Sequence, residues 1–190
     1  LVKWLGLGYE LCTWETAETV GSAALEAFFA HRTAVDARDA EADARGHAGP
    51  TAEELREALR DPELTPPATG KSLRDYQEEG VRWMRQRYAS GRSVILGDEM
   101  GLGKTAQSCC MLHWLSTLPG AGGPYLIVAP LSTVPHWKRE VAVWTRLYAL
   151  VYHGHKKARE AAVRWEWATE EGAERGPGRG GKWGAPPDTL

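Results

Sequence analysis

The sequence predicts an α/β fold in which a parallel sheet is flanked by helices. Short, continuous apolar runs at residues 93–96, 125–129 and 149–152 are typical of strands buried inside a parallel sheet. Segments with helical spacing follow each run, and a glycine-rich turn comes directly after the first of them. Strands that alternate with helices in this way favour a three-layered arrangement with right-handed crossovers.

The glycine-rich turn, residues 97–105, reads Gly-Asp-Glu-Met-Gly-Leu-Gly-Lys-Thr and precedes an expected helix over 105–118. Strand, glycine-rich turn and helix in this order predict a phosphate-binding loop. Gly101 and Gly103 let the backbone turn tightly and aim its N–H groups at an anion, where the helix N-terminus adds partial positive charge.

This loop predicts ATP and Mg²⁺ as cofactors. Lys104 is expected to reach the β- and γ-phosphates, and the Thr105 hydroxyl is expected to join the metal shell, so these two are the candidate catalytic residues and Thr105 is the candidate metal ligand. The candidate cofactor-binding residues of the loop are Asp98, Glu99, Met100, Gly101, Leu102, Gly103, Lys104, Thr105 and Ala106.

The loop departs from the general phosphate-loop pattern at Asp98, where that pattern has glycine. The string Asp-Glu-Met-Gly-Leu-Gly-Lys-Thr instead resembles the first motif of superfamily II translocases of the Swi/Snf type. The resemblance implies a RecA-like P-loop fold, with residues 71–190 as the N-terminal, truncated part of a helicase ATP-binding domain. It also implies that Gln77, in the segment that precedes the loop, faces adenine; a surface glutamine on an amphipathic helix is the alternative.

Residues 129–137 resemble the next motif of the same family, whose loop touches the DNA backbone. Ser132 and Thr133 are therefore the candidate DNA contacts, because hydroxyls at a helix N-terminus can donate to a phosphate. Ordinary N-capping by the same hydroxyls is the alternative, and the two roles are compatible.

The first 31 residues resemble the C-terminal part of a chromodomain, whose motifs appear as Lys-Trp-Leu-Gly at residues 3–6 and Thr-Trp-Glu at 13–15. In chromodomains that read methyl-lysine, the residue matching Trp4 is one wall of an aromatic cage. A further wall is replaced here by Leu7, so whether this part reads methyl-lysine stays open. A core or interface tryptophan is the alternative.

Residues 32–70 are predicted to be an acidic, Ala/Pro-rich linker with a short helix. Thr51 and Glu54 form a capping box at the start of that helix, and Leu55 and Leu59 give it a narrow contact stripe. The acidic surplus is either a solvated face or a segment that lies over a basic DNA track.

Composition and charge limit the class of protein to which the chain can belong. The 190 residues carry a net charge of −2, so any basic surface must be local. Cys12, Cys109 and Cys110 lack metal-ligand spacing and fit a reducing compartment. No apolar run approaches a membrane span. Because the chain begins without Met, inside an expected strand, we expect it to be a piece of a longer protein.

A partial chromodomain, a linker and a Swi/Snf-type lobe together resemble the chromodomain-helicase-DNA-binding remodellers. The resemblance implies an ATP-dependent chromatin remodeller, a nuclear DNA translocase that couples ATP hydrolysis to moving nucleosomal DNA. Its expected partners are double-stranded DNA, nucleosomes and histones, with subunits of a remodelling complex left open.

The acidic hydrolysis motif and second lobe of that family do not appear in the sequence. We therefore expect the chain alone to bind nucleotide weakly and not to turn it over. Two alternatives remain: a non-catalytic chromatin-binding module with a vestigial P-loop, and another superfamily II P-loop ATPase.

Overall fold

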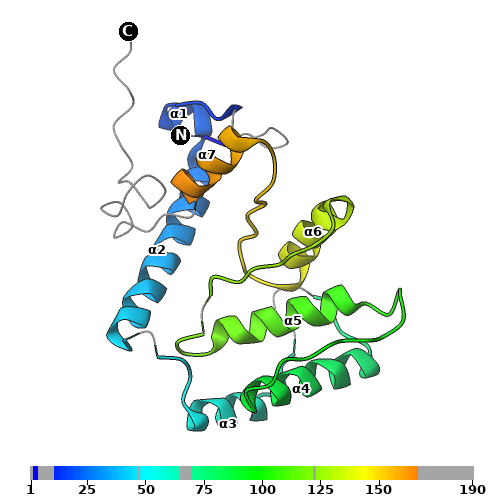
Figure 1. The fold of residues 1–190 in the computed structure, drawn as a ribbon. Helices are drawn as coiled ribbons and strands as arrows, with labels where there is room; N and C mark the ends of the chain where they lie inside the picture. The colour runs from blue at the N-terminus through cyan, green and yellow to red at the C-terminus, as the bar shows by residue number, and fades with distance from the viewer. Residues whose placement is uncertain (1, 4–10, 47, 65–69, 122, 167–190) are drawn as a thin grey trace. The chain divides into compact units, whose positions relative to one another are not determined.

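The computed structural model describes residues 2–3, 11–46, 48–64, 70–121 and 123–166 (Figure 1). The chain divides into two compact units, Leu1–Ala34 with Leu150–Leu190, and Val35–Ala149. The helices are α1 (Ala17–Val20), α2 (Ser22–Ala44), α3 (Ala52–Arg60), α4 (Asp75–Ala89), α5 (Lys104–Thr117), the 3₁₀ helix η3 (Leu131–Thr133), α6 (Val134–Trp144) and α7 (Lys156–Glu166).

The predicted RecA-like parallel sheet is wrong for the described residues, which contain helices and no strand ladder. Of the strand expected at the N-terminus, the described residues show one antiparallel bridge, between Val2 and Thr13. Residues 93–96, 125–129 and 149–152 form neither helix nor strand and have no neighbouring strand. Apolar composition favours the extended backbone, but only ladder hydrogen bonds with a partner turn that backbone into a sheet.

The exposure of these segments follows from the missing ladder. The side chains of Ile95, Leu126 and Val128 are 91%, 82% and 87% exposed. Leu96, next to Ile95, packs instead against the core. The segment 93–96 therefore contributes one side chain, Leu96, to the core and no buried face.

The predicted helices are confirmed more closely than the strands. Helix α3 begins after Thr51 with both hydrogen bonds of the predicted capping box to Glu54. Helix α2 extends to Ala44, well into residues predicted as linker. Alanine forms helix without tertiary contacts more readily than other residues, which accounts for this extension. The domain boundaries themselves stay a prediction.

The core of the unit Val35–Ala149 lies where α4 packs on α5, with α3 against α4 and α6 against α5. Its buried side chains are Leu64, Leu73, Val81, Met84, Ala106 and Cys110. Burial raises the pKa of the Cys109 and Cys110 thiols to about 12, so both are protonated near neutral pH and act as small apolar residues.

Trp114 and Arg85 attach the segment around α3 to this helix pair. The Trp114 indole N–H donates to the Ala58 carbonyl at 3.3 Å. The Arg85 guanidinium lies 5.2 Å from the Trp114 ring centroid and donates to the carbonyls of Asp61 and Glu63 at 3.4 and 2.8 Å. Both side chains are nearly fully buried, so α3 and the turn after it belong to the packed unit.

Glu54 makes the attachment of α3 sensitive to acid. Hydrogen bonds from Arg45 at 3.1 and 3.0 Å, and from the Thr51 backbone, lower the pKa of Glu54 to about 2. A carboxyl group with a lowered pKa stabilises the fold above its ordinary pKa, and that contribution is lost as pH falls.

We expect the folded chain to lose stability from Glu54 as pH falls from about 4.5 towards 2. A Glu54→Gln variant should have a lower free energy of unfolding than the unsubstituted chain at pH 7. Between pH 7 and pH 3, that free energy should fall less in the variant than in the unsubstituted chain, as measured by urea unfolding at both pH values. Equal losses in the two proteins would contradict this account. Glu53→Gln, on the exposed side of the same helix turn, is the matched control.

The other unit is organised at the start of α7. His155 Nδ1 accepts a hydrogen bond from the Ala158 N–H at 3.3 Å, which caps the first turn of α7. Ala158 and Ala162 are buried along one side of this helix. Among the described helices, none is both long and apolar enough to cross a membrane. The chromodomain residues Trp4 and Leu7 lie outside the described residues, as do residues 167–190.

Candidate functional site

The glycine loop, residues 97–103, leads into the N-terminus of α5. Gly101 and Gly103 have φ of 89° and 79°, in the left-handed region that favours glycine, and Gly103 is the N-cap residue of α5. The first N–H groups of a helix have no partner within the helix. In the loop that precedes them, Gly97 and Gly101 would have open space around an added Cβ. A glycine-rich loop at a helix N-terminus is an arrangement that can bind an anion.

Lys104, the first residue of α5, turns its side chain back onto the loop. Its Nζ atom donates to the carbonyl oxygens of Asp98 at 2.5 Å and Glu99 at 2.9 Å. An ammonium group has three N–H donors, so these two bonds leave one for a ligand. The positive charge is held inside the loop by the loop's own backbone.

Gln77 joins α4 to the end of the glycine loop. Its Oε1 atom accepts from the Arg74 N–H at 2.9 Å, and its Nε2 atom donates to the Leu102 carbonyl at 3.0 Å. A Cβ on Gly103 would lie 2.3 Å from that Nε2 atom, so a larger residue at this position would displace the Gln77 amide. The structure thus places Gln77 at the loop; the predicted contact with adenine is not tested by it.

The remaining predicted loop residues divide by exposure. Met100 is 93% exposed, and Asp98, Glu99 and Leu102 are also exposed. Thr105 is half-buried in the first turn of α5, and Ala106 is buried against α4 in the core. No group of three or more metal-ligating side chains forms among the residues that the structure describes.

Gln107 is a site residue that the sequence analysis missed. It is fully buried (0% exposed), and its Nε2 atom donates to the Asp98 carboxylate at 3.3 Å. A Cβ on Gly80 of α4 would lie 2.1 Å from the Gln107 Oε1 atom. The signal in the sequence was Gly80 itself, because glycine inside a helix is unfavourable unless another group approaches closely.

Ser132 and Thr133 lie apart from the glycine loop in sequence, in η3 before α6. Ser132 is exposed, whereas the Thr133 hydroxyl donates to the Pro130 carbonyl at 2.8 Å. Neither side chain caps α6, so the N-capping alternative does not hold in this structure. Their contact with DNA stays a prediction.

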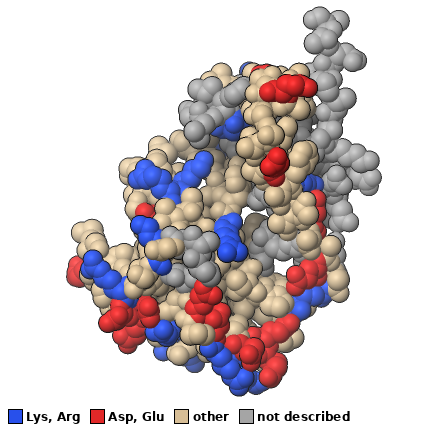
Figure 2. All heavy atoms as spheres, turned by 180° about the vertical axis from the view of Figure 1, so that it is seen from behind, with Lys and Arg blue, Asp and Glu red and all other residues tan. Residues whose placement is uncertain are grey.

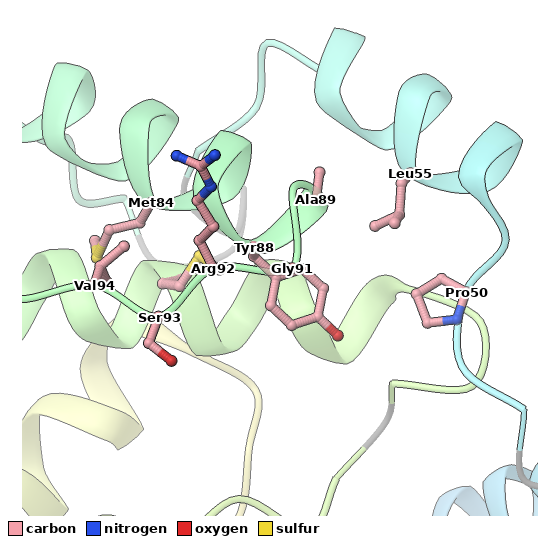
Figure 3. Close-up of a pocket in the computed structure, with 10 residues that line it drawn as sticks. Pro50, Leu55, Met84, Tyr88, Ala89, Gly91, Arg92, Ser93 and Val94 are labelled. Atoms are coloured by element: carbon pink, nitrogen blue, oxygen red, sulfur yellow. The ribbon is translucent and has the colours of Figure 1, made fainter.

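A separate hollow of about 630 Å³ lies between α3, the end of α4 and residues 91–94 (Figure 3). Its lining is mostly apolar and consists of Pro50, Leu55, Met84, Tyr88, Ala89, Gly91, Arg92, Ser93, Val94 and Met111. None of the predicted site residues lines it. Figure 2 shows acidic and basic side chains interspersed over the described residues of one face, in line with a net charge of −2.

Comparison with known proteins identifies the class of this chain. Residues 76–174 match the model of the SNF2-related domain, so the chain carries a domain of the SNF2-related class. Residues 1–31 match the model of the Chromo (chromatin organisation modifier) domain.

The similar proteins narrow this class. Chromodomain-helicase-DNA-binding protein 7 of Homo sapiens is 38% identical over 166 residues, which are 87% of this chain and 5% of that protein. Protein 8 of Xenopus tropicalis is 37% identical over 166 residues, 87% of this chain and 7% of its own length. Protein 9 of Mus musculus is 38% identical over 166 residues, 87% of this chain and 5% of its own length.

The chain therefore belongs to the chromodomain-helicase-DNA-binding family of SNF2-related chromatin remodellers, as its motifs predicted. It spans 5–7% of the length of these relatives.

Proposed function

We propose that this chain supplies the nucleotide-binding loop of an ATP-dependent chromatin remodeller, a DNA translocase that couples ATP hydrolysis to moving nucleosomal DNA. The observation that carries the proposal is the placement of Lys104. Its ammonium group lies on the carbonyls of the glycine loop, in front of a helix N-terminus. Membership of the SNF2-related family supports the same reading.

The residues of the loop fit a nucleotide with Mg²⁺. Backbone N–H groups at the start of α5 and the Lys104 ammonium would hold the phosphates, and the Thr105 hydroxyl would hold the metal. Bound Mg²⁺ would neutralise charge on the phosphates during their transfer to water. For Gln77 to recognise adenine, its amide would have to use its remaining donor and acceptor capacity or give up Leu102.

The proposed setting follows from the names of the relatives, which are chromodomain-helicase-DNA-binding proteins. Their names indicate DNA as a partner. Within the proposal, chromatin with its nucleosomes and histones is the substrate, and the nucleus is the place of action. Within this proposal Ser132 and Thr133 contact the DNA backbone, since both precede a helix and the Ser132 side chain is exposed.

Lys104→Ala tests the proposed activity in the full-length natural protein that carries this chain. We expect nucleosome-stimulated ATP hydrolysis to fall at least about a hundredfold, because the substitution removes a charged donor at the phosphates. Lys138→Ala, an exposed lysine of α6, is the matched control and should leave hydrolysis unchanged.

Two results would contradict the proposal. Hydrolysis that persists in Lys104→Ala would show that the glycine loop is not the nucleotide site. No hydrolysis by the natural protein, with chromatin binding intact, would indicate a non-catalytic chromatin-binding module.

A further inference from the structure

We propose that Gln107 is a positioning residue that fixes the entry of the glycine loop by holding the carboxylate of Asp98. The part of this inference that concerns nucleotide phosphates rests on the proposed function. Its geometric part, the hold on Asp98, is testable without any nucleotide.

Two donors on one face of α5 bind Asp98, one at its backbone carbonyl and one at its side-chain carboxylate. The Lys104 ammonium donates to its backbone carbonyl at 2.5 Å, and the Gln107 amide donates to its carboxylate at 3.3 Å. Residues three apart on a helix lie on the same face, which brings these two donors to one residue of the loop. The first two turns of α5 therefore set where the loop begins.

The burial of Gln107 indicates that its amide has a role beyond packing. The side chain is 0% exposed, and its Oε1 atom has no hydrogen-bond partner among the described residues. Leaving a buried acceptor unpaired lowers stability, and an apolar side chain of the same length would avoid that cost. What the amide offers instead is the N–H that reaches Asp98.

The Asp98 carboxylate fixes the orientation of this amide, and Gly80 leaves room for its other end. A Cβ at Gly80 would lie 2.1 Å from Oε1, so the carbonyl end of the amide is pressed against the α4 backbone. The reverse orientation would turn the amide oxygen towards the Asp98 carboxylate, where two acceptors repel. The N–H end therefore has to face the loop.

Gln107 and Gln77 form hydrogen bonds with opposite ends of the glycine loop. Gln77 holds the exit of the loop through the Leu102 carbonyl, and Gln107 holds its entry through Asp98. Met100, between the two, is 93% exposed. The curvature of the loop is thus set by two amides from the α4–α5 pair before any ligand arrives, a form of preorganisation.

Gln107→Met separates positioning from packing, because methionine keeps the length and volume of the side chain but loses its amide. We expect the affinity for fluorescently labelled ATP with Mg²⁺ to fall about five- to tenfold, the loss of one hydrogen bond to a charged group. The unfolding midpoint should stay the same or rise, since the unpaired Oε1 is removed. Gln86→Met, an exposed glutamine of α4, is the matched control.

Hydrogen exchange of the free chain provides the readout that a purely structural role would not change. In Gln107→Met, the Leu102 amide, whose N–H donates to the Glu99 carbonyl within the loop at 3.5 Å, should exchange about tenfold faster, while amides in the middle of α4 and α5 stay unchanged. Gln107→Asn, whose shorter amide does not reach Asp98, should give the same result if the methionine variant does not fold.

Unchanged exchange in the loop, or unchanged affinity in a folded Gln107→Met, would overturn the role of Gln107. If the unsubstituted chain binds no nucleotide, the proposed function fails. In that case the exchange measurement alone decides whether Gln107 holds the loop.

Discussion

Replacing Trp114 by alanine is expected to lower the free energy of unfolding by about 3–5 kcal/mol, the range for large-to-small substitutions in a core. The side chain is 2% exposed, it donates to the Ala58 carbonyl, and it supports the Arg85 guanidinium. Its loss opens a cavity and leaves a buried cation without its aromatic neighbour. Urea unfolding followed by far-ultraviolet circular dichroism measures the effect.

Trp114→Phe is the matched control for the ring itself. Phenylalanine keeps most of the packing and the T-shaped contact with Tyr88, whose ring centroid lies 5.9 Å away, but it loses the indole N–H. The expected loss is about 1–2 kcal/mol, from one hydrogen bond and an unpaired Ala58 carbonyl. If Trp114→Ala lowers the free energy of unfolding no more than Trp114→Phe does, the Trp114 ring does not attach α3 to α5.

Gly80→Ala is expected to destabilise the α4–α5 pair by about 1–3 kcal/mol, although alanine is the better helix former by about 1 kcal/mol. The added methyl group would meet the buried Gln107 Oε1 atom at 2.1 Å, and Gln107 has no room to withdraw. Thermal and urea unfolding of the variant measure the change. Glu79→Ala, at the neighbouring exposed position, should be nearly neutral and controls for helix propensity.

A second substitution identifies the clashing partner. The double variant Gly80→Ala, Gln107→Ala should lose less stability than the two single variants together. The changes in free energy of unfolding should depart from additivity by at least about 1 kcal/mol, because the side chain that the methyl group meets is gone. Strict additivity would mean that the two residues do not touch.

The sequence predicts the helices well because their signals are local. The Thr51–Glu54 capping box depends on four consecutive residues, and the glycine that begins α5 acts through its own backbone angles. A strand has no such local signal, since its stability lies in hydrogen bonds to another segment. The apolar run that contains Ile95 was predicted as a strand, and the structure leaves that side chain 91% exposed.

In the candidate site, too, the local features were predictable from the sequence and the contacts between helices were not. Glycine spacing identifies the turn and the lysine that follows it, because Gly103 and Lys104 are neighbours in the chain. The contacts of Gln77 with Leu102 and of Gln107 with Asp98 depend on how α4 packs against α5. Only Gly80, a glycine within a helix, pointed to that packing from the sequence alone.

The central claim is that the glycine loop binds the phosphates of a nucleotide, and titration of labelled ATP with Mg²⁺ tests it most directly. Fluorescence anisotropy should show saturable binding to the chain, weakened at least about tenfold in Lys104→Ala and unchanged in Lys138→Ala. Circular dichroism of the three proteins checks that each is folded. Equal affinity in the folded Lys104→Ala variant would contradict the claim, because the ammonium group that the loop holds would then take no part in binding.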